Sequence, residues 1–118
     1  MPHALTGDGV KLYYEEAGSG TPILFVHEFA ADYKSWEPQM RFFSRQHRCI
    51  TYSARGYPPS AVPVAEDAYG WELAVHDLKG VMDKFKLDDV ILSPKPDSVL
   101  QPFVRLHPTR HREFLKIA

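Results

Sequence analysis

Two kinds of hydrophobic spacing alternate along this chain. Short apolar runs that suit buried strands are separated by segments in which apolar residues recur every three or four positions, the spacing of an amphipathic helix. Strands are expected, in chain order, at Val10–Glu16, Ile23–His27, Arg48–Tyr52, Val90–Leu92 and Phe114–Ile117. Because strands that alternate with helices favour a mainly parallel sheet covered on both faces, the pattern predicts a three-layer α/β/α fold.

Three helices are expected between these strands. Ser35 is a candidate N-cap for a helix that begins at Trp36, with Pro38 in its first turn. The clearest helix runs from Trp71 to Phe85, and a third is expected after Ser98. The apolar stripe of the clearest helix contains Trp71, Ala74, Val75, Leu78, Val81, Met82 and Phe85, and its opposite, polar face contains Asp77, Lys79, Asp83 and Lys84.

Length and composition favour one soluble domain over residues 1–118. The chain has no internal repeat, and its net charge of −1 gives no reason to expect nucleic acid or an anionic membrane as a partner. No apolar run is long enough to span a bilayer, and Met1–Thr6 does not resemble a signal peptide. Cys49 is the single cysteine and lies in an apolar strand, so we expect a buried, unpaired thiol and a cytoplasmic location.

Neither a cofactor nor a metal ion is expected from the motifs. The glycine pairs at residues 7–9 and 18–20 suit hairpin turns, because they lack the strand, spacing and helix of a nucleotide-binding fingerprint. His107 and His111 are four residues apart, but Pro108 lies between them and no further ligand completes a metal site. His76 and Asp77 are neighbours on a helix and are expected to point apart, which argues against a catalytic dyad.

Four segments, in the same order and at similar spacing, resemble motifs of the α/β-hydrolase superfamily. They are similar to its strand ending in His-Gly, the Ser-Trp-x-Pro-Gln that opens its first helix, its Arg-Gly-x-Gly-x-Ser loop and the Arg-His-Pro-Glu-Arg behind its nucleophile. The matching segments are Ile23–Phe29, Ser35–Gln39, Ala54–Ser60 and Leu106–Arg110. Glu28 replaces the family's glycine, and Pro59 lies near the loop's second glycine. The resemblance covers about the first half of a hydrolase, and so implies an incomplete α/β-hydrolase fold.

The resemblance also implies an activity and a site. The activity is hydrolysis of an ester, lactone or similar acyl substrate by a Ser, Asp, His triad, with the acid and the histidine beyond the last residue of this sequence. One oxyanion-hole donor would be the backbone N–H of Phe29, next to His27 and Glu28. The other would be the backbone N–H of the residue after the nucleophile. At His27, a structural hydrogen bond is preferred to base catalysis. Glu28 is open to two interpretations, a general base in a changed site or a solvated or capping carboxylate.

The nucleophile turn itself departs from the family. The Gly-x-Ser-x-Gly turn is expected within Leu92–Ser98, but the chain has no glycine after Gly80. Counting from the preceding helix puts the serine near Pro96, whereas counting back from His107 puts it near Pro94. Ser93 is the nearest hydroxyl and Ser98 the other choice. Because Pro94 follows Ser93 and has no N–H, Ser93 would lack its oxyanion donor.

Three interpretations follow, and the sequence leaves open whether the chain is an enzyme. The preferred one is a truncated or degenerate hydrolase-like protein, a pseudoenzyme candidate that does not catalyse the family reaction as it stands. The second is an active serine hydrolase with an irregular turn at Ser93, or one completed by another chain. The third is a non-catalytic binding or assembly module. A homo-oligomer or a completing chain, joined through an exposed sheet edge, is the expected partner.

Overall fold

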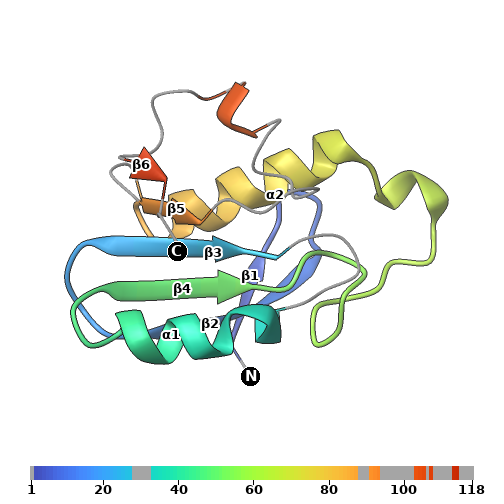
Figure 1. The fold of residues 1–118 in the computed structure, drawn as a ribbon. Coiled ribbons are helices and arrows are strands. Elements are labelled where there is room, and N and C mark those ends of the chain that lie inside the picture. The colour runs from blue at the N-terminus through green and yellow to red at the C-terminus, as the bar shows by residue number, and fades with distance from the viewer. Residues whose placement is uncertain are drawn as a thin grey trace.

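A computed structural model describes residues 2–27, 33–87, 91–93, 103–105, 107 and 113–114. The described strands form one sheet in the order β1-β2-β4-β3-β5-β6 (Figure 1). The strands are β1 (His3–Leu5), β2 (Lys11–Ala17), β3 (Pro22–Val26), β4 (Arg48–Tyr52), β5 (Ile91–Ser93) and β6 (Glu113–Phe114). β1, β2 and β4 pair antiparallel, whereas β4, β3, β5 and β6 pair parallel, so the sheet is mixed with a parallel centre.

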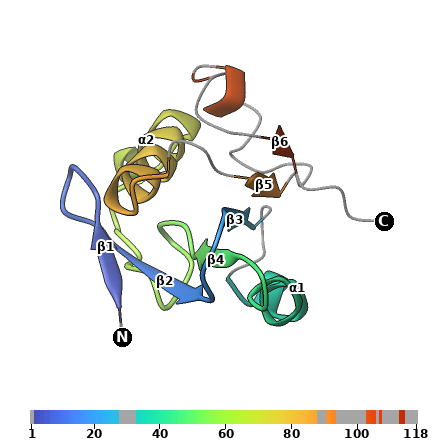
Figure 2. The same ribbon diagram turned by 90° about the vertical axis from the view of Figure 1, so that its left-hand side faces the viewer.

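Helices lie on both faces of this sheet. The helical elements are η1 (Tyr33–Trp36), α1 (Glu37–Phe43), η2 (Glu66–Ala68) and α2 (Trp71–Lys84). α1 covers one face and α2 the other (Figure 2). Residues 103–105 are also helical, and Phe103 packs into the core on the α2 side. The predicted three-layer α/β/α architecture is therefore confirmed.

Three of the predicted apolar runs are adjacent strands at the centre of the sheet. Val26 of β3 pairs with Tyr52 of β4, and Leu24 of β3 pairs with Leu92 of β5, both in parallel register. Because β3 has helices over both of its faces, its whole run from Ile23 to Val26 is buried. Successive side chains of β3 consequently enter two different cores.

One core lies under α2 and the other under α1. The α2-side core includes Leu24, Val26, Ile50, Tyr52, Val75, Leu78 and Phe103, and the α1-side core includes Ile23, Phe25, Trp36, Met40, Cys49 and Ile91. Phe43 packs against the α1-side core together with Trp36 and Met40. Burial raises the pKa of the Cys49 thiol to about 11, as expected of a cysteine that serves as a small apolar side chain.

Two details of the helices differ from the sequence prediction. Ser35 does not cap a helix at Trp36, because the chain enters α1 through the 3-10 turn η1, and Trp36 itself occupies the N-cap position without a side-chain hydrogen bond. Trp71 was expected in the apolar stripe but is 59% exposed. It is the first residue of α2, and this end of the helix extends past the ends of the strands (Figure 1).

The ends of the chain are described only in part. The short strand β1 was not predicted, since three residues are too few for a recognisable hydrophobic period. Of the strand expected at 114–117, the first residue belongs to β6 and the others lie outside the described residues. Within the described residues, no helix has the length and apolar character needed to cross a bilayer.

Candidate active-site edge

The carboxyl ends of the parallel strands β3, β4 and β5 lie at one edge of the sheet (Figure 1). In open α/β sheets, ligands bind outside this edge. The described residues that follow the strands here are His27 after β3 and residues 53–60 after β4, while Ser93 ends β5. We call these residues the carboxyl edge. Glu28 and Phe29, the other predicted site residues, lie outside the described residues.

His27 is bound into the loop that follows β4. The side chain is buried, and its Nε2 accepts a hydrogen bond of 2.9 Å from the backbone N–H of Ala54. The ring also packs against Tyr57, with 4.9 Å between the two ring centroids. Because a backbone amide can only donate, Nε2 carries a lone pair and the ring proton resides on Nδ1. The Nε2 lone pair is therefore engaged and not available to take a proton from a nucleophile.

Ser93 belongs to strand β5 rather than to a turn after it. Its Cα pairs in parallel register with Phe25 of β3. In a nucleophile turn, the serine follows the strand and adopts a strained backbone that exposes its hydroxyl. The Ser93 side chain and residues 94–100 lie outside the described residues, so the candidate nucleophiles Ser93 and Ser98 stay predictions.

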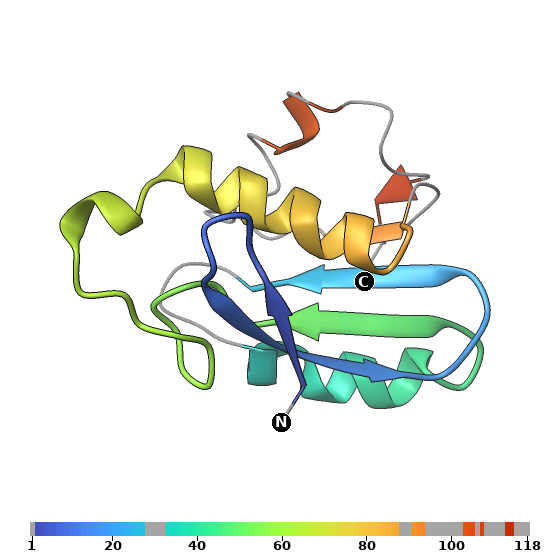
Figure 3. The same ribbon diagram turned by 180° about the vertical axis from the view of Figure 1, so that it is seen from behind.

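Arg55 is the most extensively bonded side chain of the carboxyl edge. Its Nε and Nη2 donate to both oxygens of Asp77 on α2, at 2.7 and 2.8 Å. Its Nη1 and Nη2 donate to both oxygens of Asp8 in the turn between β1 and β2, at 2.9 Å each. Nη1 also donates to the carbonyl oxygen of Ala68 at 2.8 Å. Arg55 thereby joins the N-terminal hairpin, the loop after β4, η2 and α2, and Figure 3 shows the hairpin turn close to α2.

The burial of this cluster corrects the prediction for Asp77. The sequence placed Asp77 on the solvent face of α2, but its side chain and that of Arg55 are each only 5% exposed. Burial raises the pKa of the Asp77 carboxyl, an effect that Arg55 opposes. Asp77 and then Asp8 raise the pKa of Arg55, and Arg55 holds the pKa of Asp8 well below its ordinary value. The signal that sequence reasoning overlooked is the spacing of Asp77, three residues after Ala74 and four before Val81 of the apolar stripe.

Ser60 and Gly56 complete the loop after β4. The Ser60 hydroxyl accepts a hydrogen bond from the N–H of Tyr13 at 2.8 Å and donates to the carbonyl oxygen of Ser53 at 2.6 Å. Gly56 has φ +86°, and a Cβ there would lie 2.8 Å from the ring of Tyr69. Three residues that carry the family's loop motif therefore have structural roles: Arg55 binds carboxylates, Gly56 permits the turn and Ser60 bridges β2 to the loop.

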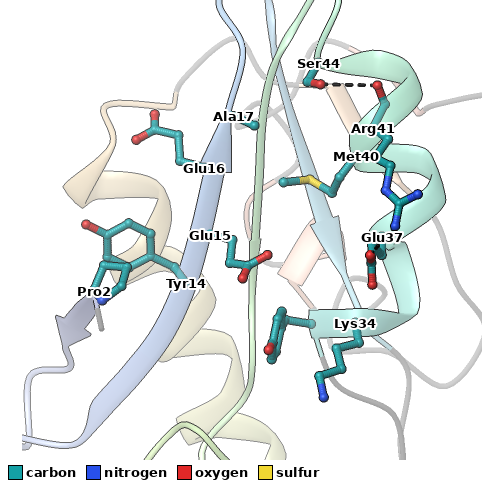
Figure 4. Close-up of a pocket in the computed structure, with 11 residues that line it drawn as sticks. Pro2, Tyr14, Glu15, Glu16, Ala17, Lys34, Glu37, Met40, Arg41 and Ser44 are labelled. Carbon is teal, nitrogen blue, oxygen red and sulfur yellow. Dashed lines mark hydrogen bonds and ion pairs between the residues drawn. The ribbon is translucent and has the colours of Figure 1, made fainter.

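A separate groove lies between β2 and α1 (Figure 4). It has a volume of about 540 Å³ and is lined by Pro2, Tyr14, Glu15, Glu16, Ala17, Tyr33, Lys34, Glu37, Met40, Arg41 and Ser44. Each carboxylate in it has a partner. Glu15 accepts from the Tyr13 hydroxyl, Glu16 pairs with Arg48 and Glu37 pairs with Arg41. His27 is not among the described residues that line this groove.

Two of the histidines considered above, His76 and His107, lie in the described part of the chain. No group of three or more His, Cys, Asp or Glu side chains there is arranged to hold a metal ion. His107 packs against the ring of Phe103, with 5.0 Å between centroids, while His111 lies outside the described residues. His76 is exposed on α2, whereas its neighbour Asp77 is buried, so the two side chains do not form a dyad.

Comparison with known proteins identifies relatives but no matching family model. The chain is 32% identical over 97 residues to a putative non-heme chloroperoxidase of Synechocystis sp., an alignment that covers 78% of this chain and 34% of that protein. It is 30% identical over 89 residues to epoxide hydrolase 2 of Siraitia grosvenorii, covering 75% of this chain and 28% of the relative. The chain thus spans about a third of the length of these curated relatives.

Solved structures have the same arrangement of elements. An esterase from Exiguobacterium antarcticum superposes with a TM-score of 0.85 at 25% identity, covering 95% of this chain and 42% of the esterase. An epoxide hydrolase mutant from Vigna radiata superposes with a TM-score of 0.87 at 27% identity, covering 96% of this chain and 36% of that structure. In both, the likeness extends over nearly the whole of this chain.

Proposed function

Because this chain belongs to the α/β-hydrolase superfamily, of which it has the N-terminal part of the fold, we propose that it is a hydrolase-like protein without a working serine nucleophile. Its substrate site, if one is used, lies at the carboxyl edge and takes an ester, lactone or similar acyl compound. The buried contacts of Arg55, Ser60 and His27 support a hydrolase-like scaffold, since they hold the loop after β4 in place at the carboxyl edge.

One observation carries the proposal that the serine nucleophile does not work: Ser93 pairs within β5 and is followed by Pro94. A proline has no N–H, so the second oxyanion donor is absent for a nucleophile at Ser93. Loss of one such donor costs about 10²–10³ in rate, and loss of the nucleophile costs about 10⁶ in a triad protease. His27 does not compensate as a base through Nε2, because that atom accepts the Ala54 N–H.

Hydrolysis assays on the full chain test this proposal. The relatives are named esterase, epoxide hydrolase and chloroperoxidase, so the panel contains an activated short-chain ester, a lactone and an epoxide. The variants are Ser93→Ala and Ser98→Ala, and the matched control is Ser44→Ala, at the C-terminal end of α1. We expect the same background rate from all four proteins. Turnover that Ser93→Ala abolishes and Ser44→Ala leaves intact would contradict the proposal.

The other two interpretations predict different outcomes of the same assays. An irregular but active turn gives ester turnover that depends on Ser93 or Ser98. A hydrolase completed by another chain gives turnover only after a fragment with the missing triad residues is added. A binding module gives no turnover. Instead, its backbone amide resonances in nuclear magnetic resonance spectra shift saturably when a non-hydrolysable ester analogue is titrated.

A partner is part of the proposal as well. β1 and β6 are the outer strands of the sheet in the described part of the chain, and strand edges with unpaired N–H and C=O groups favour association. We propose that the chain forms a homo-oligomer, or binds a completing chain, through such an edge. Light scattering over a range of concentrations tests this, and a monomer at every concentration would contradict the homo-oligomer.

A further inference from the structure

The loop after β4 also affects which ring nitrogen of His27 carries the proton. Ala54, whose N–H donates to His27 Nε2, directly precedes Arg55. The position of that N–H is therefore set by where Arg55 is held. A buried arginine with two carboxylates bound at 2.7–2.9 Å has little freedom to move.

The same loop also supplies an aromatic contact to the imidazole. The N–H of Tyr57 donates to the carbonyl oxygen of Ala54 at 3.0 Å, which closes a tight turn around Arg55 and Gly56. The turn brings the Tyr57 ring onto the His27 ring, with 4.9 Å between centroids. His27 thus has a backbone donor at Nε2 and an aromatic ring beside it, both supplied by residues adjacent to or near Arg55.

We propose that Arg55 is a positioning residue that holds His27 in the neutral, Nδ1-protonated form. Asp77 fixes the guanidinium to α2, and Asp8 fixes it to the N-terminal hairpin. With the loop held in this way, the Ala54 N–H donates to Nε2, and the single ring proton of His27 stays on Nδ1. This inference is independent of any hydrolytic activity.

Nuclear magnetic resonance on the full, ¹⁵N-labelled chain tests the proposal. Correlations between ring protons and ring nitrogens distinguish a protonated from an unprotonated Nε2, and the variant His27→Gln assigns the signals. We expect an unprotonated Nε2 at His27. His76, which is exposed on α2, supplies a reference imidazole from another part of the chain. A protonated Nε2 at His27 in the unmodified protein would overturn the proposal at once.

The variants then separate positioning from general stability. Arg55→Lys keeps the charge but loses the planar fork that binds both carboxylates. We expect the Nδ1-protonated population of His27 to fall at least twofold relative to the unmodified chain, while the His76 signals stay the same. The matched control is Arg48→Lys at the opposite end of β4, where Arg48 binds Glu16 and the carbonyl oxygen of Phe85. This control is expected to leave the His27 signals unchanged.

A second variant covers the case in which Arg55→Lys does not fold. Asp8→Asn removes only the carboxylate that is 46% exposed and leaves the buried Asp77–Arg55 pair intact. A smaller shift in the same direction is expected at His27. Two results would overturn the proposal. One is that every folded variant at Arg55 and Asp8 gives the same His27 signals as the unmodified chain. The other is that Arg48→Lys shifts the His27 signals as much as Arg55→Lys does.

Discussion

The carboxyl ends of β4 and β5 are neighbouring regions of one sheet edge, with β3 between them, and they differ in what their residues do. After β4, Arg55, Gly56 and Ser60 keep the family's loop pattern and each makes or permits a buried contact. At β5, Ser93 remains within the strand ladder and Pro94 follows it. The contacts after β4 maintain the fold, whereas a nucleophile turn after β5 would serve only catalysis.

The difference has a physical basis. A buried polar group without its partner costs free energy in every molecule, whatever reaction the protein performs. A strained nucleophile turn costs stability and is repaid only by catalysis. A chain can therefore lose the turn and still fold, but it cannot lose the Arg55 contacts as cheaply. Substitutions in the loop after β4 test this contrast.

The largest loss of stability is expected from Arg55→Ala. The substitution leaves the Asp77 carboxylate buried without its partner, which typically costs about 3–5 kcal/mol. Urea unfolding followed by circular dichroism measures the change. Arg48→Ala, at the first residue of β4, is the control, and because its pair with Glu16 is about one-third exposed, it should cost about 1 kcal/mol or less. Equal losses in the two variants would contradict the special role of Arg55.

Ser60→Ala is expected to have the next largest effect. It removes the acceptor for the Tyr13 N–H and the donor to the Ser53 carbonyl, both of which are buried. Leaving such groups unsatisfied costs about 1–3 kcal/mol, to be measured by the same urea unfolding. Ser44→Ala, whose hydroxyl makes one exposed hydrogen bond to Arg41, is the control and should change the stability little. A loss at Ser60 no greater than the loss at Ser44 would count against the bridge between β2 and the loop.

Gly56→Ala should destabilise the protein for two separable reasons. The positive φ of Gly56 disfavours any side chain, at a cost of about 1–2 kcal/mol, and the new Cβ meets the Tyr69 ring. A double-mutant cycle with Tyr69→Ala separates the two, because removing the ring relieves only the contact. If Gly56→Ala is as stable as the unmodified chain in both backgrounds, the loop does not have the described conformation in solution.

Acid should weaken the contact between the hairpin and Arg55. Arg55, and after it Thr6, holds the pKa of Asp8 below its ordinary value. The folded state therefore binds this proton less readily than the unfolded state does. The contribution of Asp8 is fully present above the unfolded pKa of about 4 and is lost as the pH falls below it. We expect the difference in unfolding midpoint between the unmodified chain and Asp8→Asn to shrink from about pH 6 to pH 3. A constant difference would contradict the assignment.

The sequence predicted the layers better than the contacts of the carboxyl edge. Continuous apolar runs identify strands such as β3 because burial on both faces leaves no polar positions. The cap at Ser35 was wrong because the 3-10 turn η1 precedes α1 and puts Trp36 at the N-cap position. Asp77 was misplaced because its partner Arg55 is 22 residues away in the chain, so a helical period assigns any carboxylate beside the stripe to solvent.

The reactivity of Ser93 tests the central claim most directly. A fluorophosphonate forms a bond between its phosphorus and the oxygen of an activated serine, with loss of fluoride, and peptide mass spectrometry locates the adduct. The contrast between the ends of β4 and β5 predicts a folded full chain with no adduct at Ser93 beyond the level at Ser44. A stoichiometric adduct at Ser93 that disappears in Ser93→Ala would mean that the chain keeps a working nucleophile, and would contradict the account.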